Sequence, residues 1–107
     1  MDLPLVAGEI QIDGLCDGTT WEKNRLDLSR GDVLSLWAKG LPENVDCANL
    51  RVTSQGRRLT VEYIEGGESA RQVNVGVPKD LRAGPATISV SVGNSNVVEL
   101  NFEIVSR

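Results

Sequence analysis

Residues 86–104 have the sequence ATISVSVGNSNVVELNFEI, and this stretch decides the fold class. Apolar and polar residues alternate from 87 to 92 and again from 98 to 104, on either side of the turn signal Gly-Asn-Ser-Asn at 93–96. Period-two alternation predicts half-buried β-strands, and two such runs joined by a short turn containing Gly and Asn predict an antiparallel hairpin. The two runs are therefore expected to pair with each other.

Five upstream segments carry similar strand signals, at residues 10–12, 33–38, 50–53, 59–63 and 73–77. Turn residues separate them, and no helical periodicity runs longer than one turn. Residues 16–32 hold few strand signals and are expected to form a long polar connection. Regularly spaced strands without helices predict an all-β fold, and specifically an immunoglobulin-like antiparallel β-sandwich of about seven strands.

Composition narrows the possible functions. The chain has 107 residues, which suits a single domain over residues 1–107, and 40% of them are hydrophobic. It has no histidine, which excludes Ser-His-Asp and Cys-His catalysis and every His metal site, and its two cysteines are too few for a four-Cys zinc site. We therefore expect no enzyme, no catalytic residues, no cofactor and no metal.

Charge and hydropathy also bear on partners. The formal net charge is −4, whereas a non-specific nucleic-acid binder needs a basic footprint, so we expect no nucleic-acid partner. The adjacent Arg57 and Arg58, with Arg82, are expected to be solvated charges that guard a hairpin edge. No apolar run approaches the roughly 18 residues that a membrane span needs, so we expect no membrane contact.

The two cysteines, Cys16 and Cys47, both lie in polar, turn-rich sequence. In a small β domain this favours a disulfide and an oxidising compartment, and the alternative is two unrelated free thiols. A bridge would also gather nearby carboxylates at one end of the sandwich, where loop oxygens could bind calcium or could simply be solvated. These carboxylates belong to Asp13, Asp17, Glu43 and Asp46.

The aromatic residues divide by context. Trp37 lies in a segment that is apolar on both faces and is expected in the core, and Tyr63 is expected to pack on a sheet. Trp21 lies in the polar stretch GTTWEKN at residues 18–24. It is the ligand-binding candidate, because an indole offers a flat apolar face for a sugar ring or a partner residue. The alternative is a loop side chain that caps one end of the sandwich.

The second half of the chain carries a more specific pattern, with LTVEYI at 59–64, RQVNVGVP at 71–78 and LRAGPATISV at 81–90. Together with GDVLSLWAKGLP at 31–42, it resembles the IPT/TIG group of immunoglobulin-like domains, and it is similar to repeat domains of large secreted acidobacterial proteins. The resemblance covers roughly residues 29–105. It implies a β-sandwich repeat without catalytic residues, located outside the cell or at its surface.

These observations predict a non-catalytic module, acting as a spacer, adhesion or protein-interaction unit. The chain is expected to be a segment excised from a longer exported multidomain bacterial protein. Its expected partners are the neighbouring domains of the same chain, and a protein or a glycan. The alternative function is a carbohydrate-binding module attached to a polysaccharide-active enzyme, with Trp21 as its platform.

Overall fold

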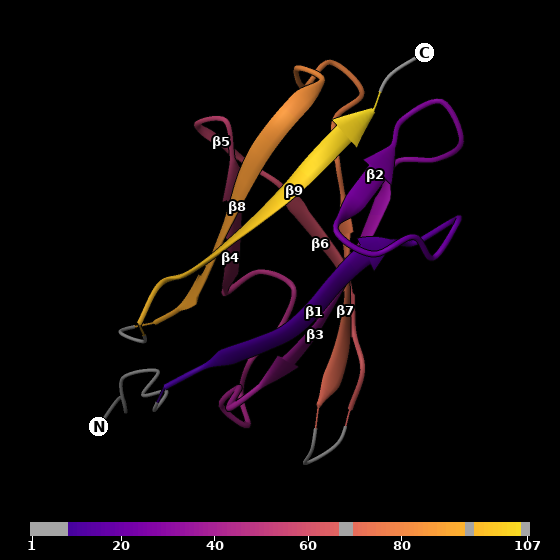
Figure 1. The fold of residues 1–107 in the computed structure, drawn as a ribbon. Coiled ribbons are helices and arrows are strands. Elements are labelled where there is room, and N and C mark those ends of the chain that lie inside the picture. The colour runs from indigo at the N-terminus through magenta and orange to yellow at the C-terminus, as the bar shows by residue number, and fades with distance from the viewer. Residues whose placement is uncertain (1–8, 67–69, 94–95, 106–107) are drawn as a thin grey trace.

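The computed structural model describes residues 9–66, 70–93 and 96–105, and these residues form nine β-strands and no helix (Figure 1). The strands are β1 Gln11–Asp17, β2 Arg25–Asp27, β3 Val33–Lys39, β4 Leu50–Ser54, β5 Arg57–Arg58, β6 Thr60–Ile64, β7 Arg71–Gly76, β8 Gly84–Val92 and β9 Val98–Val105. None of the described residues therefore belongs to a helix that could span a membrane.

The strands form two sheets, one in the order β1-β3-β7-β6 and the other in the order β2-β9-β8-β4-β5. Immunoglobulin domains place strands A, B, E and D in one sheet and strands C, F and G in the other. Here β1, β3, β7 and β6 take the positions of A, B, E and D, and β4, β8 and β9 take those of C, F and G. The strand order confirms the predicted immunoglobulin-like sandwich.

The core lies between the two sheets and is mostly aliphatic. Leu34 and Leu36 of β3 and Ile88 and Val90 of β8 belong to it, and all four are buried. Antibody domains instead join strands B and F with a disulfide that packs on a buried Trp. In this chain close packing of branched side chains replaces that bridge.

The predicted hairpin of β8 and β9 is confirmed. The two strands pair antiparallel with one-to-one register from Gly84↔Ile104 to Val90↔Val98. The prediction for residues 16–32 is wrong, because β1 extends to Asp17 and residues 25–27 form β2, which pairs parallel to β9. The alternation pattern did not predict these strand residues, because polar residues interrupt it here.

The return strand predicted at 59–63 is also more complex than the sequence pattern indicates. Gln55 and Gly56 have φ angles of 53° and 75°, so the chain turns tightly and Arg57–Arg58 pairs with the end of β4. The next residues cross to the other sheet, where β6 pairs with β7. The hairpin therefore supplies an edge to one sheet and then an edge to the other.

Two β-bulges lie on the edge strands of the β1-β3-β7-β6 sheet, between Ile12 and Gly14 in β1 and between Val61 and Tyr63 in β6. A bulge inserts one residue and reverses which face the following side chains occupy. Tyr63 consequently lies opposite Asn74 on the outer face and is 52% exposed, which corrects its predicted sheet packing. Trp37 also lies on this outer face and is half-buried, not in the core as predicted.

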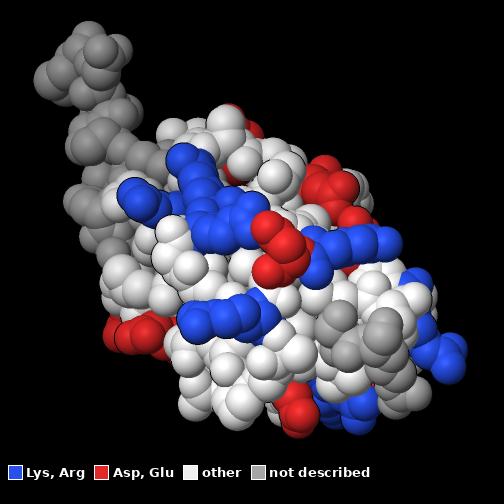
Figure 2. All heavy atoms as spheres, turned by 90° about the horizontal axis from the view of Figure 1, so that it is seen from above, with Lys and Arg blue, Asp and Glu red and all other residues white. Residues whose placement is uncertain are grey.

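Acidic and basic side chains are mixed at the end of the sandwich seen from above. Figure 2 shows Lys and Arg groups separated by Asp and Glu groups and by uncharged residues. One pair links β5 to the loop before β8, with Arg57 Nη1 2.6 Å from Asp80 Oδ1. Opposite charges at a sheet edge fit the predicted role of the exposed arginines in guarding it.

Candidate functional site

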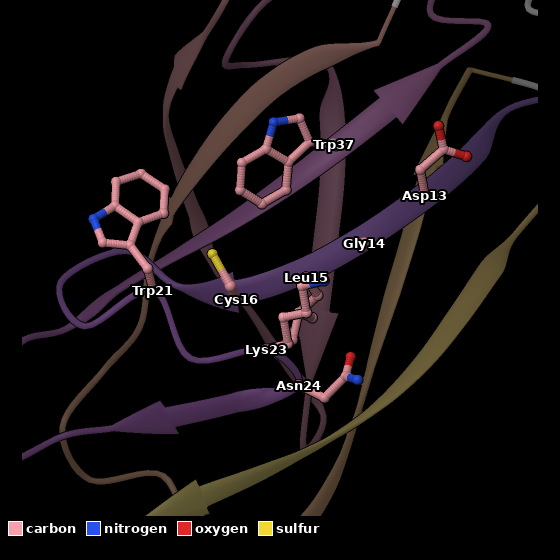
Figure 3. Close-up of a pocket in the computed structure, with 8 residues that line it drawn as sticks. All are labelled: Asp13, Gly14, Leu15, Cys16, Trp21, Lys23, Asn24 and Trp37. Carbon is pink, nitrogen blue, oxygen red and sulfur yellow. The ribbon is translucent and has the colours of Figure 1, made fainter.

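A hollow of about 340 Å³ opens on the outer face of β1 and β3 (Figure 3). Trp21 and Trp37 form two of its walls, with ring centroids 6.4 Å apart and ring planes inclined by 46°. The other lining residues are Asp13, Gly14, Leu15, Cys16, Lys23 and Asn24. The volume lies at the small end of the range for ligand pockets, roughly 300–1,000 Å³.

The hollow exists because a glycine stands opposite a tryptophan. Gly14 is the register partner of Trp37, and directly opposite side chains on one face of a sheet normally fill the space between them. A Cβ atom added at Gly14 would have nothing within 4 Å. The bulge at Asp13 places this glycine on the outer face, so local backbone geometry and a missing side chain together create the space.

Residues 18–24 fold back over the outer face and carry Trp21 with them. The Asp17 side chain is fully buried, and its Oδ1 accepts hydrogen bonds from the backbone N–H of Thr19 (2.7 Å) and Thr20 (3.1 Å). Its Oδ2 accepts from the N–H of Asp27 in β2 (2.9 Å). One carboxylate thus ties the loop to the second sheet, which fixes the position of Trp21.

The backbone at Trp21 is held in an unfavourable conformation. Its φ is 64°, in the left-handed region that costs a residue with a side chain roughly 1–2 kcal/mol. The N–H of Trp21 donates to the carbonyl of Asp17 (2.9 Å), and the N–H of Asp17 donates to the carbonyl of Glu22 (2.9 Å). Such strain persists only where surrounding contacts hold it, and it clusters at binding sites.

Cys16 forms the floor of the hollow, and in Figure 3 its sulfur lies between the two indole rings. Burial raises the pKa of the Cys16 thiol, the Asp17 carboxylate raises it further, and Lys23 acts in the opposite direction. The nucleophilic form of cysteine is the thiolate, so this thiol stays protonated and unreactive near neutral pH. It is a packing element of the site.

The predicted disulfide is wrong, because Cys16 and Cys47 are both free thiols. Cys16 lies near the end of β1, where β1 meets the start of β3, while Cys47 lies in the loop that follows the opposite end of β3. That separation is several residues of strand at roughly 3.3 Å each, whereas bridged cysteines need Cα atoms within about 7 Å. The structure thus removes the sequence argument for an oxidising compartment.

The carboxylates expected beside that bridge do not converge either. Asp13 pairs with Lys39 at 2.9 Å, and Asp46 accepts backbone hydrogen bonds within its own loop. Asp17 holds the loop of Trp21, as described above. The part of the chain that the structure describes contains no group of three or more possible metal-binding side chains.

Trp21, the ligand-binding candidate named from the sequence, lies at the hollow and is 58% exposed. Nothing in the sequence indicates that Trp37, Cys16 and Asp13, for which other roles were predicted, line the same hollow. A row of register partners crosses the outer face, from Cys16 in β1 through Ser35 in β3 and Asn74 in β7 to Tyr63 in β6. The sequence predicted strands at the positions of β3 and β7 but not that they pair. The bulges that complete the row leave no clear signal in the sequence.

We compared the chain with protein-family models, with curated proteins and with solved structures, and found no match in any of the three. The resemblance to IPT/TIG domains therefore stays a prediction. The fold and the hollow have to carry any functional argument.

Proposed function

We propose that this chain is a non-catalytic immunoglobulin-like binding module of an exported multidomain protein, where it serves as an adhesion or interaction unit. The outer face of the β1-β3-β7-β6 sheet is its recognition surface. The observation that carries this proposal is the hollow between Trp21 and Trp37. The exported, multidomain setting is supported by the family resemblance.

The energetics of the hollow favour recognition. An exposed indole at a strained backbone position contributes little to folding, yet a large, rigid aromatic side chain is the residue type that dominates binding surfaces. A half-buried second indole and a buried floor at Cys16 give a ligand both contact area and a defined depth. The buried Asp17 carboxylate supports the loop from below.

The test is a binding screen of the folded domain against arrays of glycans and of peptides, using wild type and Trp21→Ala in parallel. Trp21→Phe serves as the conservative control, because it keeps an aromatic face. We expect at least one ligand that wild type and Trp21→Phe bind and Trp21→Ala does not. Hits that all survive Trp21→Ala, or no hit on either array, would refute the proposed recognition surface.

A further inference from the structure

We infer that the ligand of this face is a neutral glycan chain, which places one sugar ring in the hollow between Trp21 and Trp37 and extends across the sheet to Tyr63. This inference rests on the proposed function and adds the ligand class and its path. It follows from three features of the outer face: the inclined indoles, the charges at the rim, and the polar row that leads to a third aromatic.

The indole pair fits a sugar ring. A pyranose has C–H faces that pack on aromatic rings and a rim of hydroxyl groups that need hydrogen-bond partners. The rings of Trp21 and Trp37, inclined by 46°, offer two apolar surfaces to such a ring. Asp13, Lys23 and Asn24 line the same hollow and supply acceptors and donors for hydroxyl groups.

Charge at the rim favours a neutral ligand. Asp13 is paired with Lys39, with 2.9 Å between the carboxylate oxygen and Nζ, and the Asp17 and Lys23 charges act on the Cys16 thiol in opposite directions. Charges of opposite sign that lie this close largely cancel at the distance of a ligand. The hollow thus lacks the single-sign field that would select a uronate, a phosphate or a basic peptide.

The path toward Tyr63 is polar and ordered. Asn74 Oδ1 accepts hydrogen bonds from Ser35 Oγ (2.9 Å) and from Gln72 Nε2 (3.0 Å). With its oxygen engaged in this way, the Asn74 side chain presents its amide N–H groups as donors. The Ser35 hydroxyl is itself buried, while Gln72 and Asn74 are half-buried and reach the surface. A dry protein–protein contact would bury these two amides against apolar surface, whereas glycan hydroxyls can pair with them.

Tyr63 sets the length of the bound segment. It lies on β6, two strand spacings or about 10 Å from β3, and its register partner is Asn74. Its ring is 52% exposed, so it can receive a second sugar ring. From β1, where Gly14 and Cys16 line the hollow, Tyr63 lies three strand spacings or about 14 Å away. A ligand has to be longer than a disaccharide to reach both positions, so binding should strengthen when the chain grows from two to four sugar units.

The experiment titrates the folded domain with four neutral probe series, namely cello-, xylo-, manno- and malto-oligosaccharides of two to six units, and follows tryptophan fluorescence and heat. We expect at least one series to bind, and within that series the tetrasaccharide should bind more tightly than the disaccharide. Trp21→Ala and Gly14→Val should each weaken tetramer binding about tenfold or more, a loss of about 1.4 kcal/mol. Gly14→Val adds side-chain bulk inside the hollow, where a Cβ atom meets nothing within 4 Å, and removes neither indole.

Two further variants locate the path. Tyr63→Ala should weaken binding of the tetrasaccharide and leave binding of the disaccharide unchanged. Thr87 lies on the outer face of the opposite sheet, so Thr87→Ala should leave the binding of both sugars unchanged. Circular dichroism of every variant shows that it is folded, and Trp21→Phe should retain most of the affinity.

The outcomes separate the ligand class from the proposed function. If no oligosaccharide binds, or if binding survives both Trp21→Ala and Gly14→Val, the glycan inference is overturned. If peptides then bind in a Trp21-dependent way, the recognition surface stands with a different ligand. If neither class binds, both proposals fail. Loss of tetramer and dimer alike in Tyr63→Ala would overturn the path toward β6 specifically.

Discussion

The two outer faces of this sandwich cover the same core and carry different chemistry. The outer face of β8 and β9 displays short polar or charged side chains, with Thr87 opposite Asn101 and Ser89 opposite Glu99. The outer face of β1, β3, β7 and β6 displays Trp37 and Tyr63, with Trp21 folded over its edge. The described aromatic side chains at the surface thus belong to one of the two faces.

The difference follows the regularity of the strands. The pairing of β8 with β9 runs one-to-one without interruption, so outward positions alternate regularly with buried ones, and most of the outward residues are polar or charged. On the opposite sheet both edge strands contain bulges, which bring Gly14 and Tyr63 to the outer face. Bulges on edge strands redirect side chains and are common beside binding sites. Irregular pairing thus coincides with the surface that carries aromatics.

The largest expected effect concerns the carboxylate that holds the Trp21 loop. Asp17→Ala removes the acceptor of three backbone N–H groups inside the protein, and we expect a loss of roughly 3 kcal/mol in unfolding free energy. Asp46→Ala is the matched control, because that carboxylate accepts two backbone N–H groups in an exposed loop and should cost about 1 kcal/mol or less. Urea unfolding of both variants measures the difference. Equal losses would contradict the anchoring role of Asp17.

The alkylation rates of the two thiols should differ, because one thiol is buried and the other is exposed. Cys16 is 4% exposed beneath the Trp21 loop, whereas Cys47 is exposed. Alkylation of Cys16 should be about 100-fold slower than that of Cys47, because it requires local opening of the loop. Mass spectrometry over time checks this, and the unfolded, unreduced chain should take two alkyl groups. A monomer that takes no alkyl group would show that a disulfide forms after all.

The predictions made from the sequence succeed where side chains alternate. The hairpin of β8 and β9 follows from period two, and the regular spacing of the strands predicts the sandwich fold. The pattern fails at the edges, since a bulge adds one residue without any compositional sign, and Tyr63 was placed on the wrong face. Trp37 was assigned to the core because its strand is apolar on both sides. One side of that strand faces the core, and the loop at residues 18–24 covers the other side at Trp37.

Truncating one side chain on each outer face tests the comparison directly. Trp37→Ala removes a half-buried indole that contacts Trp21, and we expect a loss of about 1–2 kcal/mol in unfolding free energy. Thr87→Ala on the opposite face should change it by less than about 0.5 kcal/mol. Denaturant titration measures both. Similar values would mean that the two faces do not differ in packing.

A substitution in the hollow itself is expected to raise the unfolding free energy by a small amount. Gly14→Val should raise unfolding free energy by about 0.5 kcal/mol, because valine suits a strand better than glycine and its Cβ meets open space. Gly18→Val is the control at the other end of β1, where a Cβ would lie 3.0 Å from the Val33 carbonyl oxygen and should destabilise. A stabilised variant that no longer binds would show that the hollow is kept for function. A destabilised Gly14→Val would contradict the open geometry.

The smallest effect belongs to the exposed edge of the second sheet. The hydrogen bond from Arg57 and its charge lower the pKa of Asp80 below the ordinary value of 3.8. A carboxyl whose pKa is lower in the folded state stabilises that state above pH 3.8, and the contribution disappears as pH falls through the lowered pKa. Wild type should therefore exceed Asp80→Asn in stability by a small margin at pH 6 and match it at the acid end, with less difference in high salt. A margin that persists in strong acid would mean that Asp80 acts through its shape and not its charge. The Arg57–Asp80 ion pair would then contribute nothing to the stability of the second sheet at this edge.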